Sequence, residues 1–186
     1  MSAGRLMARL VIGGLFIGHG TQKLFGWFGG PGKAGTEAMM EHLEMQPAKV
    51  HARLGGLTET LGGTLIAAGL ATPLASAALI GVMTTAIKKV HLPNGPWVSN
   101  GGWEYNAVLI SAVTALTETG PGALSLDHAL GIERKGTAWA LGALGLGVTT
   151  AALTMTAAQR PSAAPGGAGV ASGGDPTTAG AKPTGQ

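Results

Sequence analysis

Cysteine is absent from this chain of 186 residues, and charged and aromatic residues are scarce. Without a thiol, the chain can form no disulfide, no thiolate metal site and no catalytic cysteine. Charged residues make up 11% of the sequence, well below the roughly 25% of an average soluble domain. Low charge combined with 45% hydrophobic residues and 33 glycines is typical of helices that pack closely within a membrane.

Charge of either sign is too sparse to indicate a nucleic-acid partner. The chain has 12 basic and 9 acidic residues, and the basic residues are scattered. No nucleic-acid recognition motif, phosphate loop, dinucleotide glycine motif or nucleophile elbow occurs in the sequence. The histidines and neighbouring acidic residues show no spacing that predicts a metal site. We therefore expect membrane lipid, and neither nucleic acid nor a metal ion, around this chain.

Long apolar runs dominate the sequence and predict five membrane-spanning helices. The expected helices cover about residues 6–28, 51–70, 74–90, 103–120 and 137–158. Crossing a membrane takes about 20 residues, so the fourth run is short for a span. The fold class is therefore predicted to be an all-α membrane protein, with a four-helix transmembrane bundle and a fifth C-terminal transmembrane helix.

Other segments carry weaker signals. Gly14 and Gly18 form a GxxxG pair, which predicts close helix packing. No signal-peptide cleavage site follows the first apolar run, so we expect that run to remain as a span. Residues 35–53 fit either a short interfacial helix or a surface loop. Residues 160–186 are rich in Gly, Ala and Pro, a composition that predicts a disordered tail.

Ionisable residues inside the apolar runs mark the candidate site. His19 and Lys23 lie four residues apart in the first run, on one face of the expected helix, and Glu59 lies in the second run. Such groups are costly at membrane depth and usually face a protein interior or a cavity. We predict that these three residues form a catalytic site. Two interpretations remain open: an ion pair that only fixes helix packing, or a site that binds a quinone headgroup and passes protons.

Helix connectivity predicts that polar residues gather at one membrane face, beneath the two long loops. The residues expected there are His19, Lys23, Glu59, Lys88, Lys89, His91, Glu104 and Asn106. Among them, Lys88, Glu104 and Asn106 are predicted to bind a cofactor. The opposite face, at the turn of residues 71–73, is expected to be nearly featureless. Basic residues flank the spans on both sides, so charge leaves the membrane orientation open.

Several of these residues also carry a family resemblance. The residues and short motifs that carry it are Arg9, His19-Gly20, Lys23, Trp27–Gly32, Gly35-Thr36, Glu59, Gly62-Gly63, Gly69-Leu70, Thr72-Pro73, Asn100–Asn106, Gly120–Gly122 and Ser125–Asp127. Together these motifs resemble the DoxX family of small bacterial membrane proteins. The resemblance implies a four-helix membrane domain at residues 5–131 in the bacterial plasma membrane. Residues 132–159 then form an additional transmembrane helix and residues 160–186 the tail.

The resemblance also implies a function. The related DoxD proteins are subunits of a thiosulfate:quinone oxidoreductase, so this chain is expected to be a membrane subunit of a quinone-linked redox system. No motif for a bound cofactor occurs in the sequence, so we expect protein partners, the redox subunits, to supply electrons. The alternative is a non-enzymatic scaffold that recruits soluble redox or stress-response proteins. Association as a homo-oligomer is a further expectation.

Overall fold

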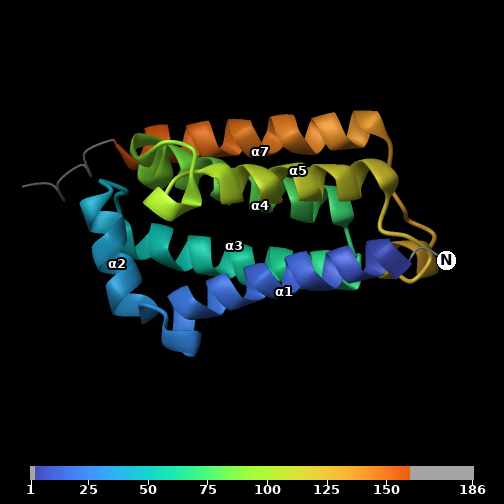
Figure 1. Ribbon diagram of the computed structural model, residues 1–186, viewed down its shortest axis with the longest axis horizontal. Helices are drawn as coiled ribbons and strands as arrows, with labels where there is room; N and C mark the ends of the chain where they lie inside the picture. Colours follow the sequence, from blue (N-terminus) through green and yellow to red (C-terminus); the bar gives the residue numbers. More distant parts are fainter. Residues whose placement is uncertain (1–2, 160–186) are drawn as a thin grey trace, which may run out of the picture.

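Five long helices lie side by side in a bundle (Figure 1). The computed structural model describes residues 3–159, and no strand occurs among them. The long helices are α1 (Ala3–Phe25), α3 (Ala48–Ala68), α4 (Thr72–Ala86), α5 (Glu104–Thr119) and α7 (Thr137–Ala158). The all-α prediction is confirmed, whereas the predicted disordered tail at residues 160–186 lies outside the described residues.

The two ends of the bundle differ in how the helices are joined. One end, which we call the loop-rich end, consists of residues 26–47 and 87–103 and includes the short helix α2 (Gly32–His42). The other, the turn end, consists of residues 69–71 and 120–136 and includes α6 (Leu126–Ala129). Figure 1 shows the N-terminus at the turn end and α2 at the loop-rich end.

Most helix boundaries agree with the sequence within a few residues. α1 ends at Phe25, three residues early, because Gly26 adopts a left-handed φ of 74° and begins a tight turn. Residues 35–42 and 48–53 are helical, and a turn at residues 43–47, which includes Pro47, separates α2 from α3. α4 continues beyond Ala86 as a turn of π-helix, Ile87–His91. The four-residue α6 was not predicted, because it is too short to show an apolar period.

Glycines bring α1 and α3 almost into backbone contact. A Cβ atom at Gly13 would lie 2.5 Å from the carbonyl oxygen of Gly63, and one at Gly63 would lie 2.6 Å from the carbonyl oxygen of Gly13. One seven-residue step further along, a Cβ at Gly20 would overlap the side chain of Thr60. The two helices can therefore approach this closely only with glycine at these positions.

The predicted packing role of Gly14 and Gly18 is wrong for the described residues. A Cβ atom at either position would meet no heavy atom within 4 Å. The two glycines lie on a face of α1 turned away from α3, because one position along a helix rotates a residue by about 100°. The sequence shows the spacing of the motif, but it does not show which face of α1 contacts α3.

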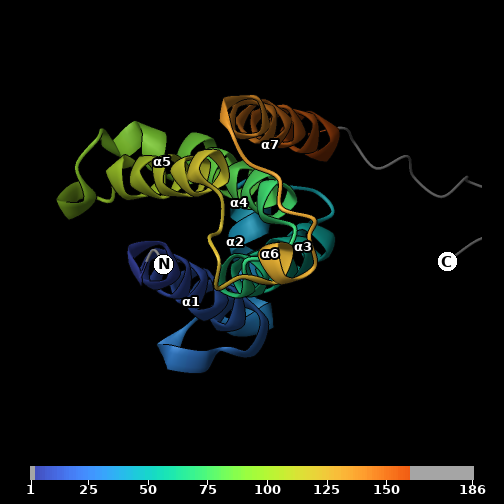
Figure 2. The same cartoon turned by 90° about the vertical axis from the view of Figure 1, so that its right-hand side faces the viewer.

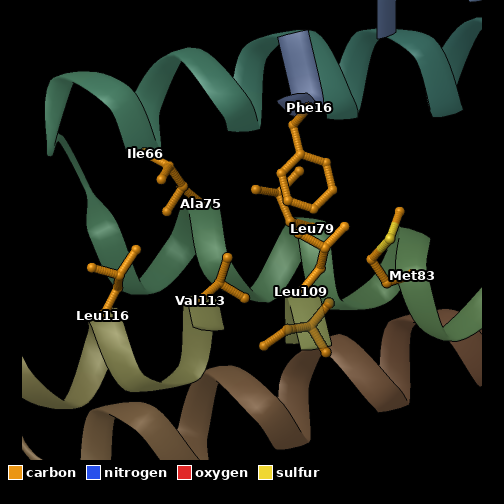
Figure 3. Close-up of a cluster of buried hydrophobic side chains, with 9 residues drawn as sticks. Phe16, Ile66, Ala75, Leu79, Met83, Leu109, Val113 and Leu116 are labelled. Carbon is orange, nitrogen blue, oxygen red and sulfur yellow. The ribbon is translucent and has the colours of Figure 1, made fainter. Parts of the chain in front are cut away.

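An apolar core fills the space between α1, α3, α4 and α5 (Figure 3). It consists of Phe16, Ile66, Ala75, Leu79, Ile80, Met83, Leu109, Val113 and Leu116. One polar pair lies at its edge, where the buried Thr117 hydroxyl donates to the hydroxyl of Ser76 at 2.8 Å. Because this pair is hydrogen-bonded, it avoids the cost of an unsatisfied polar group.

The turn end is not featureless, which corrects the expectation from sequence. The carboxylate of Asp127, 1% exposed, accepts hydrogen bonds from the backbone N–H of Ala71 at 2.7 Å and from both the N–H and the hydroxyl of Thr72. The buried Arg9 guanidinium donates to the carbonyl of Leu124 and packs against Gly69. These contacts fasten the connection of residues 120–136 to the turn between α3 and α4.

Replacing Gly20 should separate α1 from α3. We expect Gly20→Ala to lower the free energy of unfolding by about 1–3 kcal/mol, as overpacking of a close contact typically does. Gly18→Ala is the matched control, because a methyl group there meets open space and should leave stability unchanged. Thermal unfolding in detergent measures both. Equal stability of the two variants would contradict the packing described above.

Candidate functional site

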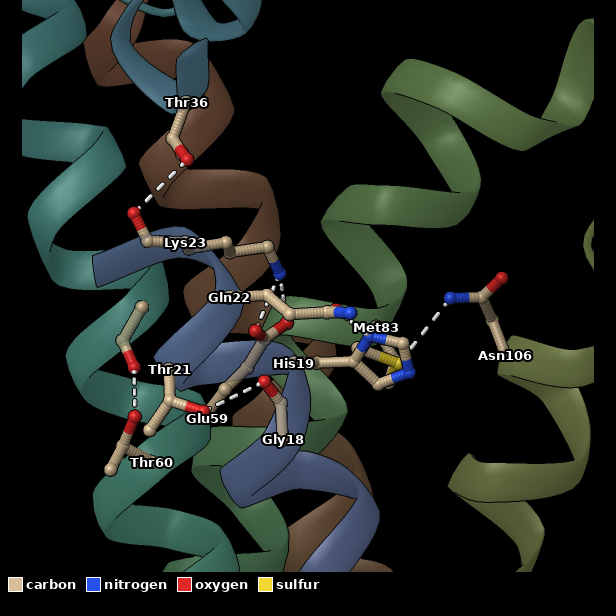
Figure 4. Close-up of polar contacts among 11 residues, drawn as sticks. Gly18, His19, Thr21, Gln22, Lys23, Thr36, Glu59, Thr60, Met83 and Asn106 are labelled. Carbon is tan, nitrogen blue, oxygen red and sulfur yellow. Dashed lines mark hydrogen bonds and ion pairs between the residues drawn. The ribbon is translucent and has the colours of Figure 1, made fainter. Parts of the chain in front are cut away.

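Lys23 and Glu59 form an ion pair between α1 and α3 (Figure 4). The Nζ atom of Lys23 donates to both carboxylate oxygens of Glu59. Glu59 is 1% exposed, whereas the Lys23 side chain is 24% exposed. Lys23 lies in the last turn of α1, where the helix dipole favours a positive charge. Within the pair, the Glu59 carboxylate is therefore buried, whereas the Lys23 side chain remains partly accessible.

Local contacts hold the Lys23 backbone in place. The hydroxyl of Thr36, at the start of α2, donates to the carbonyl oxygen of Lys23 at 3.2 Å and to that of Gly32 at 2.7 Å. Thr36 is 1% exposed. The hydrogen bond to Lys23 connects α2 to the end of α1, next to the ion pair.

A cavity of about 410 Å³ opens beside the pair. Both Lys23 and Glu59 line it, and the rest of its wall is mostly apolar. The apolar lining includes Met39, Met40, Leu43, Met45, Ala52, Leu54, Ala78, Val82, Ala86, Val90 and Ala151. An apolar cavity of this size with a few polar groups is typical of a small-molecule site.

The cavity follows the length of α4. Lining residues on this helix and its extension recur from Ala78 to Val90 at a helical spacing, which spans roughly 18 Å at about 1.5 Å per residue. α3 and α7 lie on either side of α4, as Figure 2 shows in end view, and both helices contribute residues to the lining of the cavity. The cavity is therefore an elongated cleft between α3 and α7, which begins at the loop-rich end and has α4 as its floor.

His19 lies outside this cleft. Its Nδ1 is 3.2 Å from the Oε1 of Gln22, and its ring meets that of Tyr105 edge-on, with centroids 6.5 Å apart. No contact among residues 3–159 joins His19 to Lys23 or Glu59 through their side chains. Although His19 and Lys23 share a side of α1, the structure brings only Lys23 to the carboxylate.

The three predicted cofactor-binding residues also lie outside the cleft. Lys88 is exposed, the carboxylate of Glu104 accepts from the backbone N–H of Val98 at 2.6 Å, and Asn106 donates to the sulfur of Met83 at 3.3 Å. Glu104 and Asn106 thus stabilise the fold around the loop of residues 87–103.

Lys89 lines the cleft in their place. Its Nζ donates to the carbonyl oxygen of Leu43 at 3.0 Å, which ties the extension of α4 to the end of α2. A signal was present in the sequence, because Lys89 continues the spacing of Val82 and Thr85 along one face of the helix. Sequence reasoning placed both lysines at this face of the membrane, but it assigned the cofactor-binding role to Lys88.

The charged groups in the cleft have a defined chemical capacity. Lys23 presents an ammonium donor, and Glu59 presents a carboxylate that accepts hydrogen bonds and protons. Among residues 3–159, no three His, Asp or Glu side chains gather closely enough to hold a metal ion. The cleft can bind an apolar molecule through its wall and orient a carbonyl or hydroxyl group against the pair.

The arrangement of polar and apolar groups defines the class of protein. Two helical segments, Thr72–Asn94 and Thr137–Ala158, are long and apolar enough to cross a membrane. The ionisable groups Arg9, Glu59 and Asp127 are each only 1% exposed. Charged groups inside and apolar side chains outside are the pattern of a helical membrane protein.

Comparison with known families agrees with this class. Residues 4–92 match the model of the DoxX family, whose members are membrane proteins. The resemblance predicted from the sequence is therefore confirmed for these residues, which run from α1 to the extension of α4. α5 and α7 lie beyond the matched part. No curated protein and no solved structure matches the chain.

Breaking the ion pair should destabilise the bundle. Removing one partner of a buried pair costs roughly 3–5 kcal/mol, because the remaining charge is left uncompensated. We expect Glu59→Gln and Lys23→Met each to approach the lower end of this range, since Lys23 is partly exposed. The double variant should recover part of the loss. Unfolding in detergent at several temperatures measures all three.

Lys33→Met is the matched control, because Lys33 is an exposed lysine of α2 that does not line the cleft. Its unfolding free energy should change by no more than about 0.5 kcal/mol. If the losses of the two single variants simply add in the double variant, the two side chains do not interact.

Proposed function

We propose that all five long helices cross the bacterial plasma membrane, four as a bundle and α7 as a fifth span. α1 and α3 are not among the two segments that are apolar enough by composition alone, and both carry charged residues, among them Arg9, Lys23 and Glu59. Two of these side chains are buried, and Lys23 is paired with Glu59. The exposed side chains of the two helices include the apolar residues Met7, Leu10, Val11, Leu15, Leu54, Leu57 and Leu61. A lipid-facing surface of this kind supports spans despite the charges.

α5 is slightly short for a membrane span, but the bilayer can adapt to its length. Its 16 residues extend about 24 Å, whereas the apolar part of a bilayer is about 30 Å thick. Local thinning or the turns that precede α5 can make up the difference at modest cost. The exposed Val108 on this helix is consistent with contact to lipid.

Five spans place the start of α1 and the end of α7 on opposite sides of the membrane. Because the chain has no cysteine, single cysteines at Gly4 and Gln159 can be labelled without background. We expect an impermeant maleimide to label only one of the two in intact cells. Labelling of both after permeabilisation is the control. Equal labelling of both before permeabilisation, or release of the chain by alkaline carbonate, would contradict five spans.

For the cleft, we propose that the chain is a membrane subunit of a quinone-linked redox system. The observation that carries this proposal is the mostly apolar cavity of about 410 Å³ with the Lys23–Glu59 ion pair in its wall. A quinone combines a flat ring bearing two carbonyl oxygens with an apolar tail. The Lys23 ammonium would donate to one carbonyl, and the apolar lining would surround the ring.

The chemistry of reduction assigns separate roles to the pair. Conversion of a quinone to a quinol adds two electrons and two protons to the ring oxygens. The electrons come from a partner redox subunit, as the resemblance implies. Glu59 would accept protons from the loop-rich end and pass them to the ring oxygens, and Lys23 would balance the developing negative charge. Lys89 lies on the same wall and adds a second positive charge near the loop-rich end.

His19, Lys88, Glu104 and Asn106 have no place in the cleft, so any role of theirs is exerted from outside it. His19 lies one turn before Lys23 on α1 and is exposed. We propose that it exchanges protons with solvent near the cleft. His19→Phe keeps a ring against Tyr105 and removes that exchange, so it should affect turnover without affecting quinone binding.

A non-enzymatic scaffold is the second candidate. It is supported by three exposed aromatic side chains that pack on one another at the end of α1: Phe25, Trp27 and Phe28. Such a cluster can anchor the membrane interface or contact a partner. On this reading the ion pair only fixes helix packing, and partner recruitment is independent of quinone.

Purification of the chain with its native partners, followed by a quinone reduction assay, separates the two functions. We expect the complex to reduce decylubiquinone. Glu59→Gln and Lys23→Met should weaken quinone binding about tenfold or more, as expected for loss of a hydrogen bond to a charged group. Lys33→Met should match the unsubstituted chain. Absence of quinone binding with intact partner recruitment would favour the scaffold.

A further inference from the structure

α7 forms one wall of the cleft, although it lies outside the family match. Its lining residues are Thr150, Ala151 and Thr154, whose spacing places them on one helix face. α7 is held firmly against α4, because a Cβ at Gly147 would lie 2.7 Å from the carbonyl oxygen of Ala77. The wall is therefore a fixed part of the bundle, and the helix contributes residues to the same cavity as Glu59.

The threonine hydroxyls in the cleft fall into two kinds. Thr85 and Thr150 donate to carbonyl oxygens of their own helices, those of Gly81 and Gly147, both at 2.9 Å. Thr58 and Thr154 also line the cleft, yet neither hydroxyl has a hydrogen-bond partner within residues 3–159. A free hydroxyl on an otherwise apolar wall is available to a ligand.

The free hydroxyls lie on opposite walls. Thr58 is on α3, next to Glu59 in sequence, and Thr154 is on α7. A ligand in the cleft thus meets one donor from each wall in addition to Lys23. Hydrogen-bond donors at separate points around an apolar cavity suit a ring that carries several acceptor oxygens, and the distribution of donors would fix the ring orientation.

The cleft is reached from the side of the bundle. Leu54, which lines it, is 54% exposed, and Thr154 is exposed as well. α4 packs against both α3 and α7 and lies between them (Figure 2). If the helices span the membrane, this side faces lipid tails rather than water.

We propose that α7 is the specificity wall of the site: Thr58 and Thr154 donate hydrogen bonds to ring oxygens of a lipid-soluble quinone, which enters sideways between α3 and α7 and leaves its tail in the membrane. The proposal rests on the quinone function proposed above and deepens it. On this proposal α7, which lies outside the residues that match the family, takes part in recognising the ligand.

The hydroxyls can be removed one at a time without changing side-chain volume much. We expect Thr154→Val and Thr58→Val each to weaken the binding of decylubiquinone about fivefold, as expected for loss of one neutral hydrogen bond. Thr150→Val is the control inside the cleft, because its hydroxyl is already engaged. Thr149→Val is the control on α7 outside it. Both controls should bind as the unsubstituted chain does, and thermal unfolding checks that all four variants are folded.

The outcomes separate the two proposals. If Thr154→Val binds decylubiquinone normally while Glu59→Gln loses binding, the quinone site stands and the role of α7 is refuted. If the unsubstituted chain binds no quinone, the proposed function fails and this inference fails with it. An equal loss in Thr150→Val would show that wall packing, and not the free hydroxyl, determines affinity, which would also overturn the inference.

The direction of entry needs a separate probe. A decylubiquinone analogue with a photoreactive diazirine at the end of its tail should label the outer edge of the cleft, at peptides that contain Leu54 or residues 150–154. Labelling of Met39 and Met40 on α2 would place the tail at the loop-rich end and overturn sideways entry.

Discussion

The close approach of α1 to α3 is the constraint on which the candidate site depends. At Gly13, Gly20 and Gly63 no side chain separates the two helices. With the helix axes this close, Lys23 reaches Glu59 directly, and both carboxylate oxygens of Glu59 are satisfied. A wider separation would leave a buried carboxylate facing an apolar core. The glycine contacts and the ion pair therefore stabilise the same interface and depend on each other.

α4 is the second organising element, because it faces two different environments. One side of the helix contributes Leu79, Ile80 and Met83 to the dry core that it shares with α1, α3 and α5. The other side, from Ala78 to Val90, forms the floor of the cleft between α3 and α7. The Lys23–Glu59 pair lies where core and cleft meet. In that position the Glu59 carboxylate is buried, and the pair remains accessible to a ligand in the cleft.

The buried polar contacts differ between the two ends of the bundle. At the turn end, Asp127 and Arg9 fasten the chain with hydrogen bonds to backbone groups, and the strongly buried charges there are used for structure. At the loop-rich end, α2 and the extension of α4 are tied together beside the cleft, where Lys89 donates to the carbonyl of Leu43. Sequence reasoning expected polar groups at one end only, because it could not pair Arg9 with a residue more than a hundred positions away.

The sequence by itself determined the all-helical class, the resemblance to the DoxX family and the approximate bounds of five helices, and it singled out Lys23 and Glu59 as charges that need a partner. These follow from local patterns: apolar runs, breaks at Gly and Pro, and charges that are too costly to leave in lipid. Only the tertiary structure decided which glycines form the α1–α3 contact, that His19 points away from the pair, and that Lys89 rather than Lys88 lines a cleft. It also decided that α7 closes that cleft. Each of these depends on helix rotation and on contacts between distant segments, because a single rotation of about 100° moves a residue from one face of a helix to another.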